Sequence, residues 1–341
     1  MSLRLRPADV AVAAAALLAS PAAARAPDLQ GVWTNTTLTR LERPAAYGDR
    51  RAMPAEDVTR LEGAEARVAT LARAPTAASA TVKDLPADCT GGRGSACNYN
   101  AGWTDSGDRV MRVGGEARTS LVTTPADGRI PYRPEVRARL DALPRGGTAQ
   151  PGAEPPERPG ASDNPENRSL GERCILAFGY SGGPVMLPSL YNNTYQIVQT
   201  PEEVVVVVEM VHDVRHIRLN ARHRTDGVRP WLGDSIGWWE GSTLVVETVG
   251  YHRSQSFLGA SADHLKVTER FTRSGPKRLL YRFTVENPNA FTQPWGGEYE
   301  FSPANGPVYE YACHEGNYGL RSILAGVRER ERTPAEGRPG G

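Results

Sequence analysis

The residues best suited to chemistry gather in the stretch 209–216, which holds two histidines, two carboxylates and an arginine. A valine-rich run precedes it, so the sequence predicts a single strand over 204–219. On such a strand Asp213 and Arg215 share one face, and His212 lies on the other. His212 or Asp213 can then transfer a proton while Arg215 holds a developing anion. The alternative is an exposed ion pair between Asp213 and Arg215.

A second polar cluster occupies residues 309–318, near the C-terminal end of the chain. His314 can move a proton here, and Glu315 can orient that histidine. Tyr309 and Tyr311 share one face of a predicted strand and are candidate ligand-binding residues. The alternative is a strand end that is pinned by a disulfide and carries polar groups on its surface.

The cysteines predict how the two clusters come together. They are Cys89, Cys97, Cys174 and Cys313. An even number of cysteines in an exported chain indicates two disulfides. The pairing that closes the smallest loop joins Cys89 to Cys97, and it leaves Cys174 to pair with Cys313. That second bridge draws Arg173, Tyr191 and Asn192 toward His314 as further ligand-binding candidates. No C-x-x-C spacing is present, so we expect no metal site.

The stretch 234–241 offers two more candidate ligand contacts, Asp234 and Trp238. Trp238 and Trp239 are adjacent, so on a strand one points inward and the other outward. An outward tryptophan provides either a flat stacking surface for an aromatic or sugar-like ligand, or a contact for a covering helix.

The first 26 residues have the pattern of a cleaved secretory signal peptide, with a basic start, a short apolar run and an Ala-x-Ala end. We therefore expect a periplasmic or secreted protein. The 40 basic residues balance the 39 acidic ones, which argues against nucleic acid as a partner. No later stretch is long and apolar enough for a transmembrane helix.

Beyond residue 191 the chain alternates short apolar runs with turns. Successive hairpins without long helices between them predict a mainly β fold, an antiparallel sheet that curls into a barrel. Helical spacing of apolar residues predicts an N-terminal helix over 54–73, packed on the sheet. We expect one barrel domain over 27–331. An exposed loop over 145–167 and a disordered tail over 332–341 are predicted from their Pro, Gly and polar content.

The motif Gly31-Val32-Trp33 resembles the opening of lipocalin-type barrels. In those barrels the tryptophan closes one end and packs on an arginine from a late strand. The resemblance implies Arg328 or Arg330 for that role.

Several stretches together are similar to a large, mostly unnamed family of exported bacterial proteins. The matching pieces are 28–33, 118–121, 127–131, 173–174, 191–193, 212–215, 233–235, 239–241, 269–272 and 309–318. The resemblance covers most of the mature chain and implies an exported, β-rich, lipocalin-like domain without assigning catalytic residues. The chain departs from the common pattern at Ala221-Arg222, where Asp-Gly-Arg is usual.

These patterns predict an exported protein that binds a small aromatic or sugar-like molecule in a barrel pocket. A cofactor-independent acid–base enzyme, such as a lyase, isomerase or hydrolase, is one alternative, and an envelope-associated structural protein is another. We expect no cofactor.

Overall fold

The computed structural model of the chain describes residues 26–73, 105, 107–142, 163–177, 183–315 and 318–332. Several expectations lie outside this part of the chain. They are the signal peptide before residue 26, the bridge between Cys89 and Cys97, most of the loop 145–167, and the tail after residue 332.

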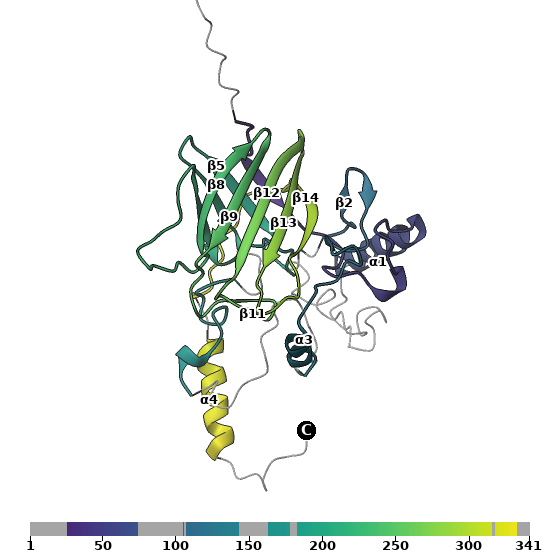
Figure 1. The fold of residues 1–341 in the computed structure, drawn as a ribbon. Coiled ribbons are helices and arrows are strands. Elements are labelled where there is room, and N and C mark those ends of the chain that lie inside the picture. Colours follow the sequence, from purple (N-terminus) through teal and green to yellow (C-terminus); the bar gives the residue numbers. More distant parts are fainter. Residues whose placement is uncertain are drawn as a thin grey trace, which may run out of the picture.

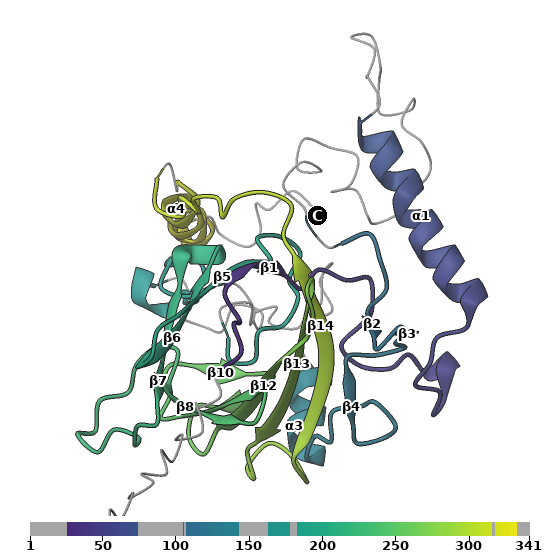
Figure 2. The ribbon, with the colours of Figure 1, turned by 90° about the horizontal axis from the view of Figure 1, so that it is seen from above.

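A closed β-barrel forms the centre of the described chain (Figures 1 and 2). Its strands, in their order around the barrel, are β1 (Gly31–Thr34), β5 (Thr194–Gln199), β6 (Glu203–Val208), β7 (Val214–Leu219), β8 (Asp234–Glu240), β9 (Thr243–Val249), β12 (Lys266–Gly275), β13 (Arg278–Glu286) and β14 (Trp295–Pro303). Pairing of β1 with one end of β14 closes the ring, and β4 (Val122–Thr124) pairs with the other end of β14. The predicted barrel is thereby confirmed.

The direction of one strand differs from the prediction. β7 and β8 pair in parallel, with Ile217 opposite Ser235, whereas the other neighbouring barrel strands are antiparallel. The 14-residue connection from Asn220 to Gly233 is long enough to carry the chain back to the end where β7 began, so β8 runs in the same direction. The prediction of an all-antiparallel barrel is therefore wrong at this pair.

The predicted single strand over 204–219 is also wrong, because it is two strands, β6 and β7, joined by a tight turn. The turn contains the short 3-10 helix η6 (Met210–His212). Val211 and His212 have positive φ angles of 58° and 45°, and this backbone reverses the chain. Strand alternation therefore does not extend across residues 209–213.

Alternating apolar residues fill the interior of the barrel. On β13, Leu279, Tyr281, Phe283 and Val285 are buried, and the residues between them lie outside. Aromatic side chains from β12, β13 and β14 contact one another there, and the rings of Tyr281 and Tyr299 are 4.8 Å apart between centroids. Burial of these rings supplies much of the hydrophobic stabilisation of the barrel.

Trp33 closes one side of the core, and the arginine beside it is not the expected one. The guanidinium of Arg273, on β12, lies 4.8 Å from the centroid of the Trp33 ring. The indole N–H donates to the carbonyl of Leu29 at 3.1 Å. Arg328 instead lies exposed on the C-terminal helix α4 (Gly319–Arg332), which the sequence patterns did not predict.

The helices and the short hairpins surround the barrel. The remaining elements are α1 (Ala55–Arg73), α3 (Pro134–Asp141), the 3-10 helices η1 (Ala45–Tyr47) and η5 (Pro165–Asn167), and the strands β2 (Arg112–Val113), β3 (Glu116–Ala117), β10 (Ser256–Phe257) and β11 (Ala260–Ser261). α1 lies beside the β2–β3 hairpin and away from the barrel wall (Figure 2). Glu62 of α1 binds Arg112 of the hairpin at 2.8 Å. The expectation that this helix packs on the barrel sheet is wrong. None of the described helices is long and apolar enough to span a bilayer.

Candidate functional site

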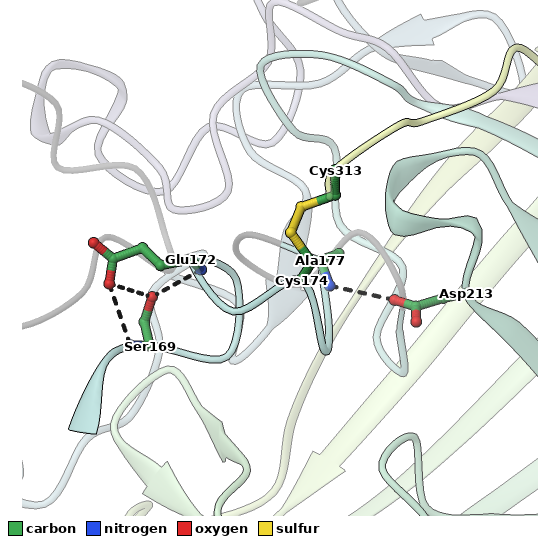
Figure 3. The surroundings of a disulfide bond; sticks show 6 residues. All are labelled: Ser169, Glu172, Cys174, Ala177, Asp213 and Cys313. Carbon is green, nitrogen blue, oxygen red and sulfur yellow. Dashed lines mark hydrogen bonds between the residues drawn. A yellow bond between two sulfur atoms is a disulfide. The ribbon is translucent and has the colours of Figure 1, made fainter. Parts of the chain in front are cut away.

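Four connecting segments meet at the end of the barrel where β6 passes into β7. We call residues 169–177, 188–193, 209–213 and 309–315 the loop cluster. After β14 the chain runs past β1 and β5 toward α4, which brings its last segment to this end (Figure 2). The disulfide between Cys174 and Cys313 joins the first segment to the last, with Cα atoms 5.8 Å apart (Figure 3). This predicted pairing is confirmed, and it holds together segments 139 residues apart.

A capping box orders the segment that carries Cys174. The side chain of Ser169 accepts a hydrogen bond from the Glu172 backbone, and the Glu172 carboxylate accepts one from the Ser169 backbone (Figure 3). Arg168 pairs with the same carboxylate at 2.5 Å. These contacts fix the turn that presents Cys174 to Cys313.

Asp213 is the titratable group most suited to proton transfer in the loop cluster. Its Oδ2 accepts a hydrogen bond from the backbone N–H of Ala177 at 3.3 Å (Figure 3). Burial raises the pKa of Asp213 to about 6, although the Ala177 hydrogen bond and the charge of His212 act in the opposite direction. A carboxyl group with this pKa exchanges protons readily near neutral pH.

Glu209 lies at the start of the same turn and is only 5% exposed. The side-chain amide of Asn192 donates to its Oε1 at 3.0 Å, which ties segment 188–193 to the turn. Partial burial, followed by the negative charge of Glu209, raises the pKa of Asp105 to about 6. Asp105 is nevertheless solvent-exposed, whereas Asp213 is partly buried. Asp213 is therefore the stronger candidate for an acid–base role.

Tyr191 and Tyr311 add an aromatic pair to the loop cluster. Their hydroxyl groups lie close enough for each to influence the pKa of the other. Burial raises the pKa of both tyrosines, that of Tyr311 to about 12, so both hydroxyls stay protonated at neutral pH. Each ring is partly buried against the core, and the pair offers both flat apolar surface and hydrogen-bonding capacity.

Strained backbone is concentrated in the loop cluster. Cys174, Asn192, Val211 and His212 all have positive φ angles, between 45° and 58°. For a β-branched residue such as Val211 this conformation is unfavourable and is maintained by the surrounding structure. Such residues are frequent at functional sites, which favours the loop cluster as a site.

The other predicted residues of the loop cluster lie toward solvent. His212, His314 and Glu315 are exposed, and Tyr309 is 66% exposed. Arg173 donates to the backbone carbonyl of Glu166 at 3.3 Å. The structure thus brings residues of both sequence clusters to one end of the barrel, with Asp213, Asn192, Tyr191 and Tyr311 the more sheltered of them.

Three predicted residues lie elsewhere. Arg215 points into the barrel, where it pairs with Glu269 and not with Asp213. Asp234 lies on the outer face, where it binds Arg218 at 2.7 Å and His223 at 2.9 Å. Trp238 is on that face too, and its indole N–H donates to the Glu240 carboxylate.

Sequence reasoning missed Glu269, the partner of Arg215 in the barrel interior. Glu269 is fully buried between Val267 and Phe271 on the inward face of β12. It accepts a hydrogen bond from the Tyr281 hydroxyl at 2.7 Å. A lone carboxylate on an otherwise apolar strand face is the signal that could have identified it.

The described residues contain no group of three or more histidine, cysteine or acidic side chains that could hold a metal ion. In comparisons with known proteins, no family model matches this chain, and neither a curated protein nor a solved structure matches it.

Proposed function

We propose that this protein is an exported β-barrel protein that binds a small, ring-shaped ligand carrying hydroxyl groups, and that the loop cluster is its binding site. The observation that carries the proposal is the convergence of Tyr191, Asn192, Asp213 and Tyr311 through one disulfide and two loop hydrogen bonds. These residues come from segments that are far apart in the sequence.

The chemistry of the cluster suits a sugar-like ligand or a hydroxylated aromatic one. The tyrosine rings offer apolar surface to a ring face, and their hydroxyls can donate or accept hydrogen bonds. An ionised Asp213 accepts hydrogen bonds from ligand hydroxyls, and such charge-assisted bonds are stronger than neutral ones. Asn192 can supply both a donor and an acceptor.

Acid–base catalysis is the second candidate function, and the raised pKa of Asp213 favours it. In this version Asp213 removes or returns a proton on the bound ligand, and exposed His212 or His314 exchanges it with solvent. Turnover of a bound compound by the native chain, abolished in Asp213→Asn with binding retained, would favour this alternative.

The proposal includes export of the protein from the cytoplasm. A disulfide that joins distant segments is typical of proteins from oxidising compartments. Membership of the exported, lipocalin-like family rests on the sequence motifs given above and stays a prediction.

Calorimetric titration tests the binding function. The mature chain would be titrated with a panel of methyl glycosides and with 4-hydroxybenzoate. We expect at least one of these probes to bind, and Tyr311→Phe to weaken that binding by about fivefold, the effect of one hydrogen bond. Tyr318→Phe is the matched control, because Tyr318 is 75% exposed. Absence of binding across the panel, or equal affinity in both variants, contradicts the proposal.

A further inference from the structure

A short segment of the chain lies inside the barrel. We call Gly183–Leu187 the strap. Val185 and Met186 are fully buried in it, and Leu187 is 4% exposed. The strap belongs to no strand, and its one backbone hydrogen bond among the described residues is internal, from the N–H of Leu187 to the carbonyl of Val185. Side chains of the barrel wall therefore hold it in place.

The wall holds one backbone unit of the strap from both sides. The carbonyl of Met186 accepts hydrogen bonds from the side-chain amide of Asn35, at 2.9 Å, and from the Tyr299 hydroxyl. The N–H of Met186 donates to the Tyr281 hydroxyl at 3.3 Å. The N–H and the carbonyl of Met186 are thus both hydrogen-bonded to wall side chains. These come from β13, from β14 and from the residue that follows β1.

Tyr281 connects the strap to a buried ion pair. Its hydroxyl donates to Glu269, and Glu269 binds the guanidinium of Arg215 through both of its oxygens. Burying such a pair carries a large desolvation cost, and apolar residues of similar volume would stabilise a simple core at least as well. The interior therefore contains more polar functionality than packing requires.

The close approach of the strap to this pair depends on glycine. Gly183 has a φ of +75°, and a Cβ atom there would lie 2.8 Å from the Met186 Cγ and 3.1 Å from an Arg215 guanidinium nitrogen. In the same region, Nε of Arg215 and Oδ1 of Asn35 are buried and lack a hydrogen-bond partner among the described residues. Two polar atoms of the wall thus remain available for further hydrogen bonds beside the strap.

The strap lies between two residues of the loop cluster that are held by hydrogen bonds, one before it in the chain and one after it. Before it, the Ala177 N–H binds the Asp213 carboxylate. After it, the N–H of Ser189 donates to Oδ1 of Asn193 at 2.7 Å. Because Gly183–Leu187 pairs with no strand, its movement requires no break in the strand pairing of the described barrel.

From these contacts we infer that the barrel interior is a second binding site, that the strap is its displaceable occupant, and that the site accepts a short apolar peptide. A peptide reproduces what the wall recognises: one backbone N–H, one carbonyl and flanking apolar side chains. The inference does not depend on ligand binding at the loop cluster.

Hydrogen exchange on the native chain tests whether the strap can leave. We expect the Met186 amide to exchange through a local opening, with protection about 100-fold or more below that of the Tyr281 amide in β13. Equal protection of the two amides would mean that the strap leaves only on global unfolding, and would overturn the inference.

Peptide binding tests the site itself. Met186→Asp places a charge in the apolar interior and should expel the strap, and Val198→Asp, at a partly exposed position on β5, is the control. We expect the peptide acetyl-Gly-Pro-Val-Met-Leu-Pro-amide to bind Met186→Asp at least tenfold more tightly than the control. A folded Met186→Asp variant that does not bind it would contradict the inference. If that variant does not fold, the exchange experiment decides.

Discussion

Arg215 and Glu269 face each other across the interior of the barrel, and both side chains are almost completely buried. Nη1 and Nη2 of Arg215 lie 3.1 and 2.6 Å from the two carboxylate oxygens of Glu269. Because β7 and β12 are separated by β8 and β9 in the sheet, this pair links two strands that are not neighbours in the barrel wall.

Removing one charge of this pair should be strongly destabilising. Glu269→Gln leaves Arg215 buried and uncompensated, and we expect a loss of about 3–5 kcal/mol in the free energy of unfolding measured with urea. Glu240→Gln is the control, because Glu240 pairs with Arg270 at an exposed position, where loss of the pair should change stability far less. Similar losses in both variants would show that Arg215 is not isolated from water.

The raised pKa of Asp213 makes a prediction about the pH dependence of stability. The folded chain binds this proton more tightly than the unfolded chain, where the pKa is near 3.8, so Asp213 lowers stability as pH rises from about 4 to about 6. Asp213→Asn removes that penalty and should stabilise the fold at pH 7 by up to about 2 kcal/mol, after allowance for solvent screening. The difference from the native chain should disappear below about pH 4. A constant difference across this range contradicts the assignment.

The bridge between Cys174 and Cys313 should contribute a large part of the stability of the fold. In the loop-entropy account a loop of this length contributes up to about 5 kcal/mol. We therefore expect the double variant Cys174→Ala with Cys313→Ala to melt at a clearly lower temperature. Mass mapping of the native chain without reductant should recover the two cysteines in one linked peptide pair, and free thiols at these positions would contradict the structure.

Arg273 should matter more than other arginines on the barrel surface. Its guanidinium covers the Trp33 ring and donates to the carbonyls of Gly275 and Pro276. We expect Arg273→Ala to cost about 1–2 kcal/mol in urea unfolding, from the lost cation–π contact and hydrogen bonds. Arg278→Ala is the control, because Arg278 is exposed and its ion pair with Glu300 is long, at 3.7 Å. Equal costs would argue against the Trp33 contact.

The sequence was sufficient for features that depend on local pattern or on elimination. The succession of short apolar runs and turns predicted the barrel, and the cysteine count identified the bridge between Cys174 and Cys313. The turn at Val211 could not be predicted, because its left-handed backbone opposes the preference of a β-branched residue and depends on the surrounding loops.

Features that depend on tertiary partners could not be predicted either. Once the bounds of a strand are known, alternation shows which of its residues, such as Arg215, face inward. It does not identify Glu269 as the partner of Arg215. The strap escaped prediction because its N–H and carbonyl groups bind side chains from distant strands, and such contacts leave no local pattern.

Mapping of backbone chemical shifts during ligand titration tests the binding site most directly. The mature chain would be titrated with whichever methyl glycoside or phenolic acid binds it by calorimetry. We expect the largest shift changes at Tyr191, Asn192, Asp213 and Tyr311. Changes confined to the outer barrel face around Asp234 and Trp238, with none in the loop cluster, would contradict the proposed site.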